Sequence, residues 1–151
     1  MIWGIYMTEG LEALKEGIDI KQLRFAVRGR GAKFAGLSLG ERLLNLEIVF
    51  HIFNPNDFAV AIDRAKYRIY FREGGGVKIG EGAIEEGIHI PVYTAEYAKS
   101  EVKTPLTGDL AKMLIHQMEK GRTTLDFEGI THLATPEGPI DMNFKAVWKL
   151  G

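Results

Sequence analysis

The chain has 151 residues, of which 46% are hydrophobic and 26% are charged, and this composition indicates one globular domain rather than a disordered segment. It contains no cysteine, which excludes disulfides, thiol catalysis and cysteine-based metal sites. The formal net charge of −1 argues against the strongly basic surface that nucleic-acid-binding proteins carry.

The first 17 residues are expected to form an N-terminal segment (1–17), and residues 18–151 a single β-sandwich domain. The apolar run at residues 1–7 is far shorter than the roughly 20 residues that span a bilayer. It also lacks the basic residues that begin a secretory signal. We therefore expect a cytoplasmic protein without stable membrane insertion. Residues 8–17 predict a short helix whose leucines face inward.

Residues 18–27 predict a first strand, and its alternation slips near Lys21 and Gln22, a pattern typical of a β-bulge. Residues 29–36 are rich in glycine and predict a loop. A basic run crosses both segments and consists of Arg24, Arg28, Arg30 and Lys33. We interpret it as a solvated loop. A polyanion site is the alternative, which the lack of an interleaved aromatic residue disfavours.

Two long strands, residues 43–53 and 58–72, give the clearest pattern. From Leu44 to Ile52 every second residue is apolar, so one face of an extended segment lies in a core and the other lies in or near water. The run Asn54-Pro55-Asn56 then interrupts the alternation with turn-forming residues. The second strand changes phase near Asp63 and Arg64.

A glycine turn at residues 74–76 leads to a strand in which Val77 and Ile79 share one face and Gly80 and Gly82 share the other. Glycine inside a strand often marks a bulge or a close backbone approach. Two more alternating segments follow, at residues 88–92 and 102–106.

Residues 108–120 predict the one long helix, because Leu110, Leu114 and Met118 recur at helical spacing and Thr107 can cap its start.

Two strands close the chain. Leu125 and Phe127 predict the first, in which Gly129 is expected to reset the alternation before Ile130. The second, over residues 140–148, alternates regularly between apolar and polar residues.

These elements amount to about seven or eight antiparallel strands, one late helix and one short N-terminal helix. Each strand has one apolar face, and a second sheet is needed to cover it. The predicted fold class is therefore mainly all-β, as an immunoglobulin-like or fibronectin-type-III-like antiparallel β-sandwich.

Several segments in a fixed order carry a resemblance to a known family. They are HIFNPNDFAVAI (51–62), AKYRIYF (65–71), KIGEG (78–82), VKTPLTGDLAKML (102–114) and GPIDMNFKA (138–146). Together they resemble a water-stress and hypersensitive-response (WHy) domain of the late-embryogenesis-abundant group-two, desiccation-related family. The resemblance implies a compact all-β fold, a role in tolerance of water deficit and no established catalytic residues. Some relatives carry a membrane anchor before the domain, a pattern from which the short, acidic segment 1–17 departs.

No reactive constellation stands out in the sequence. The histidines are His51, His89, His116 and His132, and none has a metal-binding spacing. Ser38 lies in GLSLG, which matches the nucleophile-elbow string, but a strand rather than a helix is expected to follow it. Residues 72–82 lack the phosphate-loop pattern and predict a hairpin turn. We expect no catalytic, cofactor-binding or metal-binding residues, no cofactor and no enzymatic activity.

The predicted function is non-enzymatic protection against water stress through a folded surface. Its candidate partners are stressed client proteins or membrane surfaces, and no nucleic acid is expected. The alternative is a binding module for a lipid, a small apolar ligand or a peptide strand added at a sheet edge. An enzyme such as a hydrolase is the least favoured hypothesis.

Overall fold

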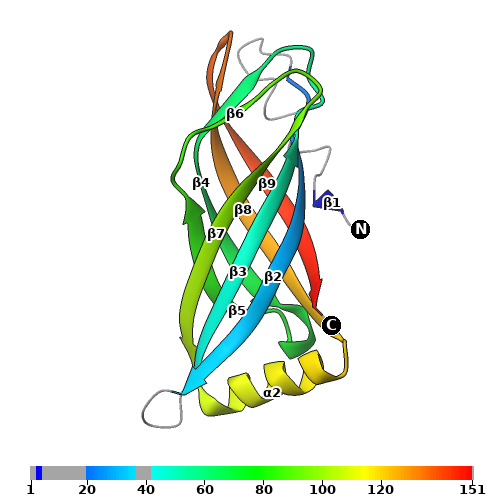
Figure 1. Ribbon diagram of the computed structural model, residues 1–151, viewed down its shortest axis with the longest axis vertical. Helices are drawn as coiled ribbons and strands as arrows, with labels where there is room; N and C mark the ends of the chain where they lie inside the picture. The colour runs from blue at the N-terminus through cyan, green and yellow to red at the C-terminus, as the bar shows by residue number, and fades with distance from the viewer. Residues whose placement is uncertain (1–2, 5–19, 37–41, 151) are drawn as a thin grey trace.

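The chain forms two antiparallel sheets in a computed structural model that describes residues 3–4, 20–36 and 42–150 (Figure 1). The larger sheet runs in the order β1 (Trp3–Gly4), β9 (Gly138–Leu150), β8 (Thr123–Thr135), β4 (Val60–Phe71) and β5 (Val77–Ile84), and β6 (Ile88–Ile90) also pairs with β4. The smaller sheet runs in the order β2 (Arg24–Gly36), β3 (Arg42–Phe53) and β7 (Ala95–Leu106). The predicted two-sheet β-sandwich is confirmed.

Helix α2 (Gly108–Glu119) lies across one end of the sandwich, as Figure 1 shows. The Thr107 side chain accepts a hydrogen bond from the Leu110 amide at 3.4 Å, and this caps the first turn. Ala111 and Leu114 are buried, so the helix closes this end of the core. The predicted late helix is confirmed, whereas the short helix predicted over residues 8–17 lies outside the described residues.

The linker between β4 and β5 is a short 3₁₀ turn, η3 (Arg72–Gly74), followed by Gly75 and Gly76. These two glycines have φ values of +79° and +73°, which favour glycine because it lacks a Cβ. The hairpin turn predicted here is confirmed.

Aromatic rings fill the space between the sheets. Phe50 is fully buried, and its ring makes edge-to-face contacts with Phe25, Tyr67, Phe127 and Phe144 at centroid distances of 6.4, 5.1, 5.8 and 6.2 Å. The alternation predicted for β3 is confirmed, since its inward residues are at most 1% exposed: Leu44, Leu46, Ile48, Phe50 and Ile52. Around Phe50, these rings therefore occupy the space in which a small apolar ligand could otherwise bind between the two sheets.

The first strand differs from its prediction at both ends. Residues 20–23 precede the strand, which begins at Arg24, so the strand start predicted at residue 18 is wrong. The loop predicted over residues 29–36 is also wrong, because β2 continues and pairs with β3 as far as Gly36. A register shift between Gly29 and Gly31 marks a bulge, which lets the strand absorb its irregular sequence and stay paired.

Gly129 does not reset the alternation of β8, so that prediction is wrong. Phe127, Gly129 and Thr131 all face the interior, whereas Ile130 is 45% exposed on the outer face. Glycine is required because a Cβ at this position would lie 2.4 Å from the Lys66 carbonyl oxygen and 2.4 Å from the Phe144 ring.

The glycines of β5 were predicted to lie opposite Ile79, and this is also wrong. A Cβ at Gly80 would meet Val102, and one at Gly82 would meet the Tyr67 hydroxyl at 2.4 Å. Both positions therefore face the interior together with the buried Ile79. The register shift in the pairing of β4 with β5, opposite this stretch, explains the change of phase.

Replacing Gly129 with alanine is expected to lower the free energy of unfolding by about 2–3 kcal/mol, because a backbone oxygen and a packed ring would have to move. Gly87→Ala is the matched control. A Cβ there meets only the Ile62 carbonyl, at 3.9 Å, and alanine is expected to leave stability unchanged or to raise it by up to about 1 kcal/mol. Urea denaturation measures both values, and equal effects would contradict the packing described for Gly129.

Candidate functional site

The four histidines lie on four different elements. His89 and His116 are exposed on β6 and α2, and His51 on β3 packs beside a tyrosine ring. His132 on β8 lies with its Nδ1 2.5 Å from Asp141 Oδ1 on β9. Among the described residues, no three His, Asp or Glu side chains gather in a way that could hold a metal ion.

Of the two serines, Ser100 lies within the described residues and Ser38 lies outside them. Ser100 on β7 donates to the Ala83 carbonyl at 3.1 Å and accepts from the Tyr67 hydroxyl at 2.5 Å, so it joins the edges of the two sheets. Burial raises the pKa of Tyr67 above its ordinary value of 10.0, and the Ser100 hydrogen bond offsets part of that rise. This serine therefore has a structural role.

The Asn54-Pro55-Asn56 turn is the centre of a buried hydrogen-bond network. Asn54 Nδ2 donates to the carbonyls of Phe58 at 2.9 Å and Ile90 at 3.1 Å. Its Oδ1 accepts from the Asn56 amide and side chain, both at 3.0 Å. Asn56 then exchanges two bonds with the backbone of Lys21, at 2.6 and 2.8 Å. The turn thus joins β6 and the segment before β2 to the end of β3.

A hollow of about 810 Å³ lies on the outer face of the larger sheet, and we call it the outer hollow. Its outward-facing side chains are Lys66 and Arg68 of β4, Glu81 and Ala83 of β5, Glu128, Ile130 and His132 of β8, and Asn143 and Lys145 of β9. The register of the four strands brings these residues together from four parts of the chain.

Charges alternate across the outer hollow. Arg68 lies in register between Glu81 and Glu128, yet each glutamate is engaged by a lysine instead. Lys78 Nζ lies 3.1 Å from Glu81, and Lys145 Nζ lies 3.4 Å from Glu128. Over the described part of the chain, Arg68 makes no ion pair.

Lys66 has a different setting in the same hollow. Its cross-strand neighbours are Ala83 on β5 and Ile130 on β8, neither of which carries a charge. It too makes no ion pair with any described residue. The unpaired ammonium of Lys66 can contact the charged part of an amphiphilic anion, and the exposed side chain of Ile130 beside it can contact the apolar part.

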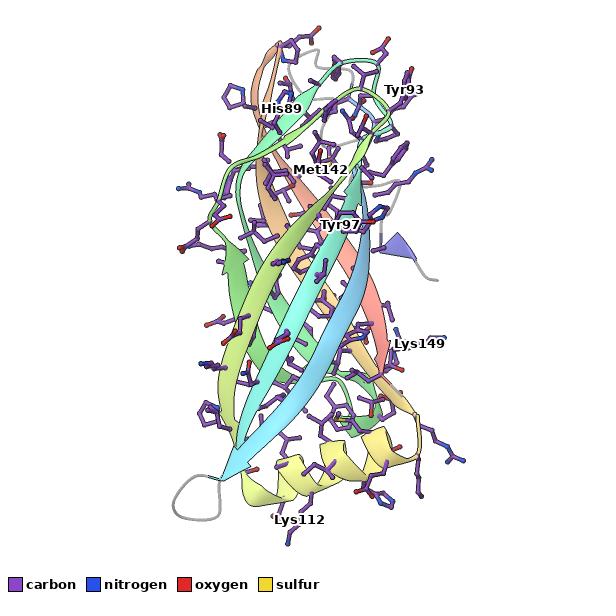
Figure 2. All side chains as sticks on the ribbon, in the orientation of Figure 1. His89, Tyr93, Tyr97, Lys112, Met142 and Lys149 are labelled. Atoms are coloured by element: carbon purple, nitrogen blue, oxygen red, sulfur yellow. The ribbon has the colours of Figure 1, made fainter. Side chains whose placement is uncertain are left out.

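A second exposed surface lies near the end of the sandwich opposite α2. It consists of Val92, Tyr93 and Tyr97, which are 41%, 60% and 58% exposed, and we call it the aromatic end. Figure 2 shows Tyr93 close to this end of the molecule and Tyr97 farther along the same side. These are three of the six large hydrophobic side chains that are exposed in the described part of the chain.

The chain turns sharply at the aromatic end. The Thr94 amide donates to the Pro91 carbonyl at 3.2 Å, so the alternation predicted to continue through Val92 ends at Ile90 and that prediction is wrong. Tyr93 has a φ of +51°, a left-handed conformation that is uncommon for a bulky residue. Pro91 is the only local signal in the sequence for this turn.

The outer hollow was not predicted from the sequence. The outward positions of Lys66 and Arg68 follow from the alternation of β4, and this was the available signal. Their proximity to Ile130 and Asn143 depends on strand pairing across more than 60 residues. In the described part of the chain, no helix is both long and apolar enough to cross a membrane.

Comparison with known proteins gives a family and a fold. The model of the LEA_2 family, described as late embryogenesis abundant protein, matches residues 49–147, which is more than half of the chain. Comparison with curated proteins finds no match. An X-ray structure of a structural-genomics target is similar over 85% of this chain and 86% of that one, at 16% identity and a TM-score of 0.55.

Two further solved structures are more distantly similar. One is a protein from Archaeoglobus fulgidus, at 12% identity over 83% of this chain and 95% of that one, with a TM-score of 0.43. The other is an uncharacterised β-sandwich protein from Clostridium difficile, at 9% identity over 89% of each chain, with a TM-score of 0.37. The family match is the informative result: the chain belongs to the LEA_2 family of late embryogenesis abundant proteins.

Proposed function

We propose that this protein is a WHy-type domain that protects partly unfolded client proteins during water stress, without catalysis and in the cytoplasm. Membership of the LEA_2 family supports the role in stress. The proposed mode of action rests on the aromatic end, where the sandwich exposes large apolar side chains to solvent. Partly unfolded proteins expose apolar segments, and such segments bind exposed aromatic side chains.

The aromatic end is held in place by its backbone. The Asn54 amide donates to the Thr94 carbonyl at 2.9 Å, and the Thr94 hydroxyl donates to the Val92 carbonyl at 2.9 Å. A left-handed tyrosine costs of order 1 kcal/mol, and such strain persists where the surrounding structure enforces it. A glycine would adopt this backbone conformation without strain.

The strand order supports a finer assignment within the proposal. We assign β2, β3 and β7 as strands A, B and E of an immunoglobulin-like sandwich, and β4, β8 and β9 as strands C, F and G, with β5 beside C. In this assignment the aromatic end lies at the start of strand E.

Drying a labile enzyme with and without this protein tests the proposal. We expect more enzyme activity to survive than with an equal mass of an inert globular protein, because the contact is made by particular side chains rather than by bulk. Equal protection by the inert protein would contradict a specific role.

Replacing Tyr93 and Tyr97 together with serine is expected to remove about half or more of the protection, because a few aromatic side chains carry most of the energy of such contacts. The matched control is the double variant Val77→Ser and Met113→Ser, which removes two exposed apolar side chains elsewhere on the surface. Enzyme activity after drying measures both. If the control variant loses as much protection as the tyrosine variant, the aromatic end is not the contact surface.

A further inference from the structure

Two cations in the outer hollow lack a counter-ion within the described chain. Lys66 and Arg68 both line this hollow from the middle of β4, and the glutamates nearest Arg68 are engaged by Lys78 and Lys145. We infer that the outer hollow binds a small organic anion, whose carboxylate or phosphate group contacts Lys66 and Arg68 and whose apolar part packs on Ile130. This site is separate from the aromatic end.

The electrostatics of the hollow favour an anion despite its two carboxylates. Each of Glu81 and Glu128 has a lysine Nζ within 3.4 Å, which offsets its charge. The charge left over is that of Lys66 and Arg68. A guanidinium and an ammonium side by side can bind a carboxylate or phosphate through charge-assisted hydrogen bonds, which are stronger than neutral ones.

The uncharged residues beside Lys66, which are Ala83 and Ile130, favour a ligand that has an apolar part as well as a charged one. Ile130 is 45% exposed and lies in register between Lys66 and Asn143. Ala83 lies on the other side of Lys66. An exposed isoleucine on the solvent face of a sheet contributes little to the core, but it offers an apolar surface beside the Lys66 ammonium.

The outer hollow is open to solvent, and its volume of about 810 Å³ leaves room for a small organic molecule. The carboxylate or phosphate could belong to a free metabolite or to a lipid headgroup, and the chemistry of recognition is the same for both. His132, held by Asp141 through Nδ1, lies at the rim and leaves Nε2 to contact a polar substituent of the ligand.

NMR titration of the full-length, ¹⁵N-labelled protein with phenyl phosphate tests the inference. We expect saturable shifts confined to amides around Lys66, Arg68 and Ile130, and weaker binding of inorganic phosphate, which lacks the apolar part. Lys66→Gln and Arg68→Gln are each expected to raise Kd by about tenfold, the effect of losing one charge-assisted bond. Ile130→Ser is expected to remove the preference for phenyl phosphate over inorganic phosphate.

Lys149→Gln is the matched control, because Lys149 is an exposed lysine of the same sheet outside the hollow. All these side chains are exposed, and circular dichroism with thermal melting verifies that each variant folds. We expect Lys149→Gln to leave Kd unchanged. An equal loss of affinity in Lys149→Gln and Lys66→Gln, or shifts that do not saturate, would overturn the site in favour of diffuse charge attraction. Shifts confined to the aromatic end would also overturn it, because they would place the binding elsewhere.

Vesicle co-sedimentation distinguishes the two sources of the anion. Binding to phosphatidylserine vesicles but not to phosphatidylcholine vesicles, with the same dependence on Lys66 and Arg68, would identify a lipid headgroup. Binding of phenyl phosphate without vesicle binding would identify a free small anion. In either case Tyr93→Ser is expected to leave the affinity unchanged, so failure at this site and failure of client protection are separate results.

Discussion

Replacing Asn54 with alanine is expected to lower the free energy of unfolding by about 3–5 kcal/mol. Its side chain is fully buried and bonds to the backbone carbonyls of Phe58, Ile90 and Pro91 and to Asn56. Alanine would leave the Phe58 and Ile90 carbonyls without their donor inside the protein, and each such orphaned group costs about 1–3 kcal/mol. The bonds from Asn56 to Lys21 would also lose their support.

Asn54→Asp sharpens this test because it keeps the size of the side chain. The carboxylate can still accept from Asn56 but cannot donate to the three carbonyls, so we expect a loss at least as large as that of alanine. Asp57→Ala, an exposed change in the same turn, is the control and is expected to stay within about 0.5 kcal/mol of the wild type. Urea denaturation gives all three values. A cost below about 1 kcal/mol for Asn54→Ala would show that the network is dispensable.

Phe50→Ala is expected to cost about 3–5 kcal/mol, the range for truncating a buried phenylalanine. The four aromatic rings around Phe50 come from both sheets, so the truncation would leave a cavity between the two sheets and remove contacts that join them. Edge-to-face contacts add a further loss beyond the buried area.

Val49→Ala is the control for Phe50, because Val49 is the preceding residue on the opposite, half-buried face of the same strand. We expect it to cost less than about 1 kcal/mol. Thermal and urea unfolding, with near-ultraviolet circular dichroism to report on aromatic packing, measure the difference. Similar costs for the two substitutions would place the centre of the core elsewhere.

Period-two alternation was sufficient to predict the strands that carry the core. In β3 and β9 the apolar positions recur without interruption, and their pattern fixes which face is buried. The two-sheet arrangement follows, because each such strand has one face to cover. The helix was equally accessible, since its capping residue and its apolar spacing are local signals.

Features that depend on contacts between distant segments could not be read from the sequence. Residues 29–36 have a loop-like composition, and only pairing with β3 makes them a strand. Gly129 and Gly82 face inward because rings from other strands fill the space of a side chain, which no local pattern reports. The Asn54-Pro55-Asn56 turn was recognised, but its partners Lys21 and Ile90 lie more than 30 residues away.

The two candidate surfaces illustrate the same limit. Lys66 and Arg68 are outward by alternation, but the outer hollow exists only because four strands align. The aromatic end arises where an apparent strand stops at Pro91 and the chain turns. Both surfaces lie on the outside of the sandwich, whose centre around Phe50 is filled by aromatic rings.

Client contact at the aromatic end is the central claim, and mapping that contact by NMR tests it most directly. The ¹⁵N-labelled protein would be mixed with a permanently unfolded client, such as a reduced and alkylated globular protein. We expect the amide signals of residues 91–97 to broaden or shift, and we expect this change to be lost in the Tyr93→Ser, Tyr97→Ser variant. Unchanged spectra, or perturbations centred on α2 or the outer hollow, would contradict it.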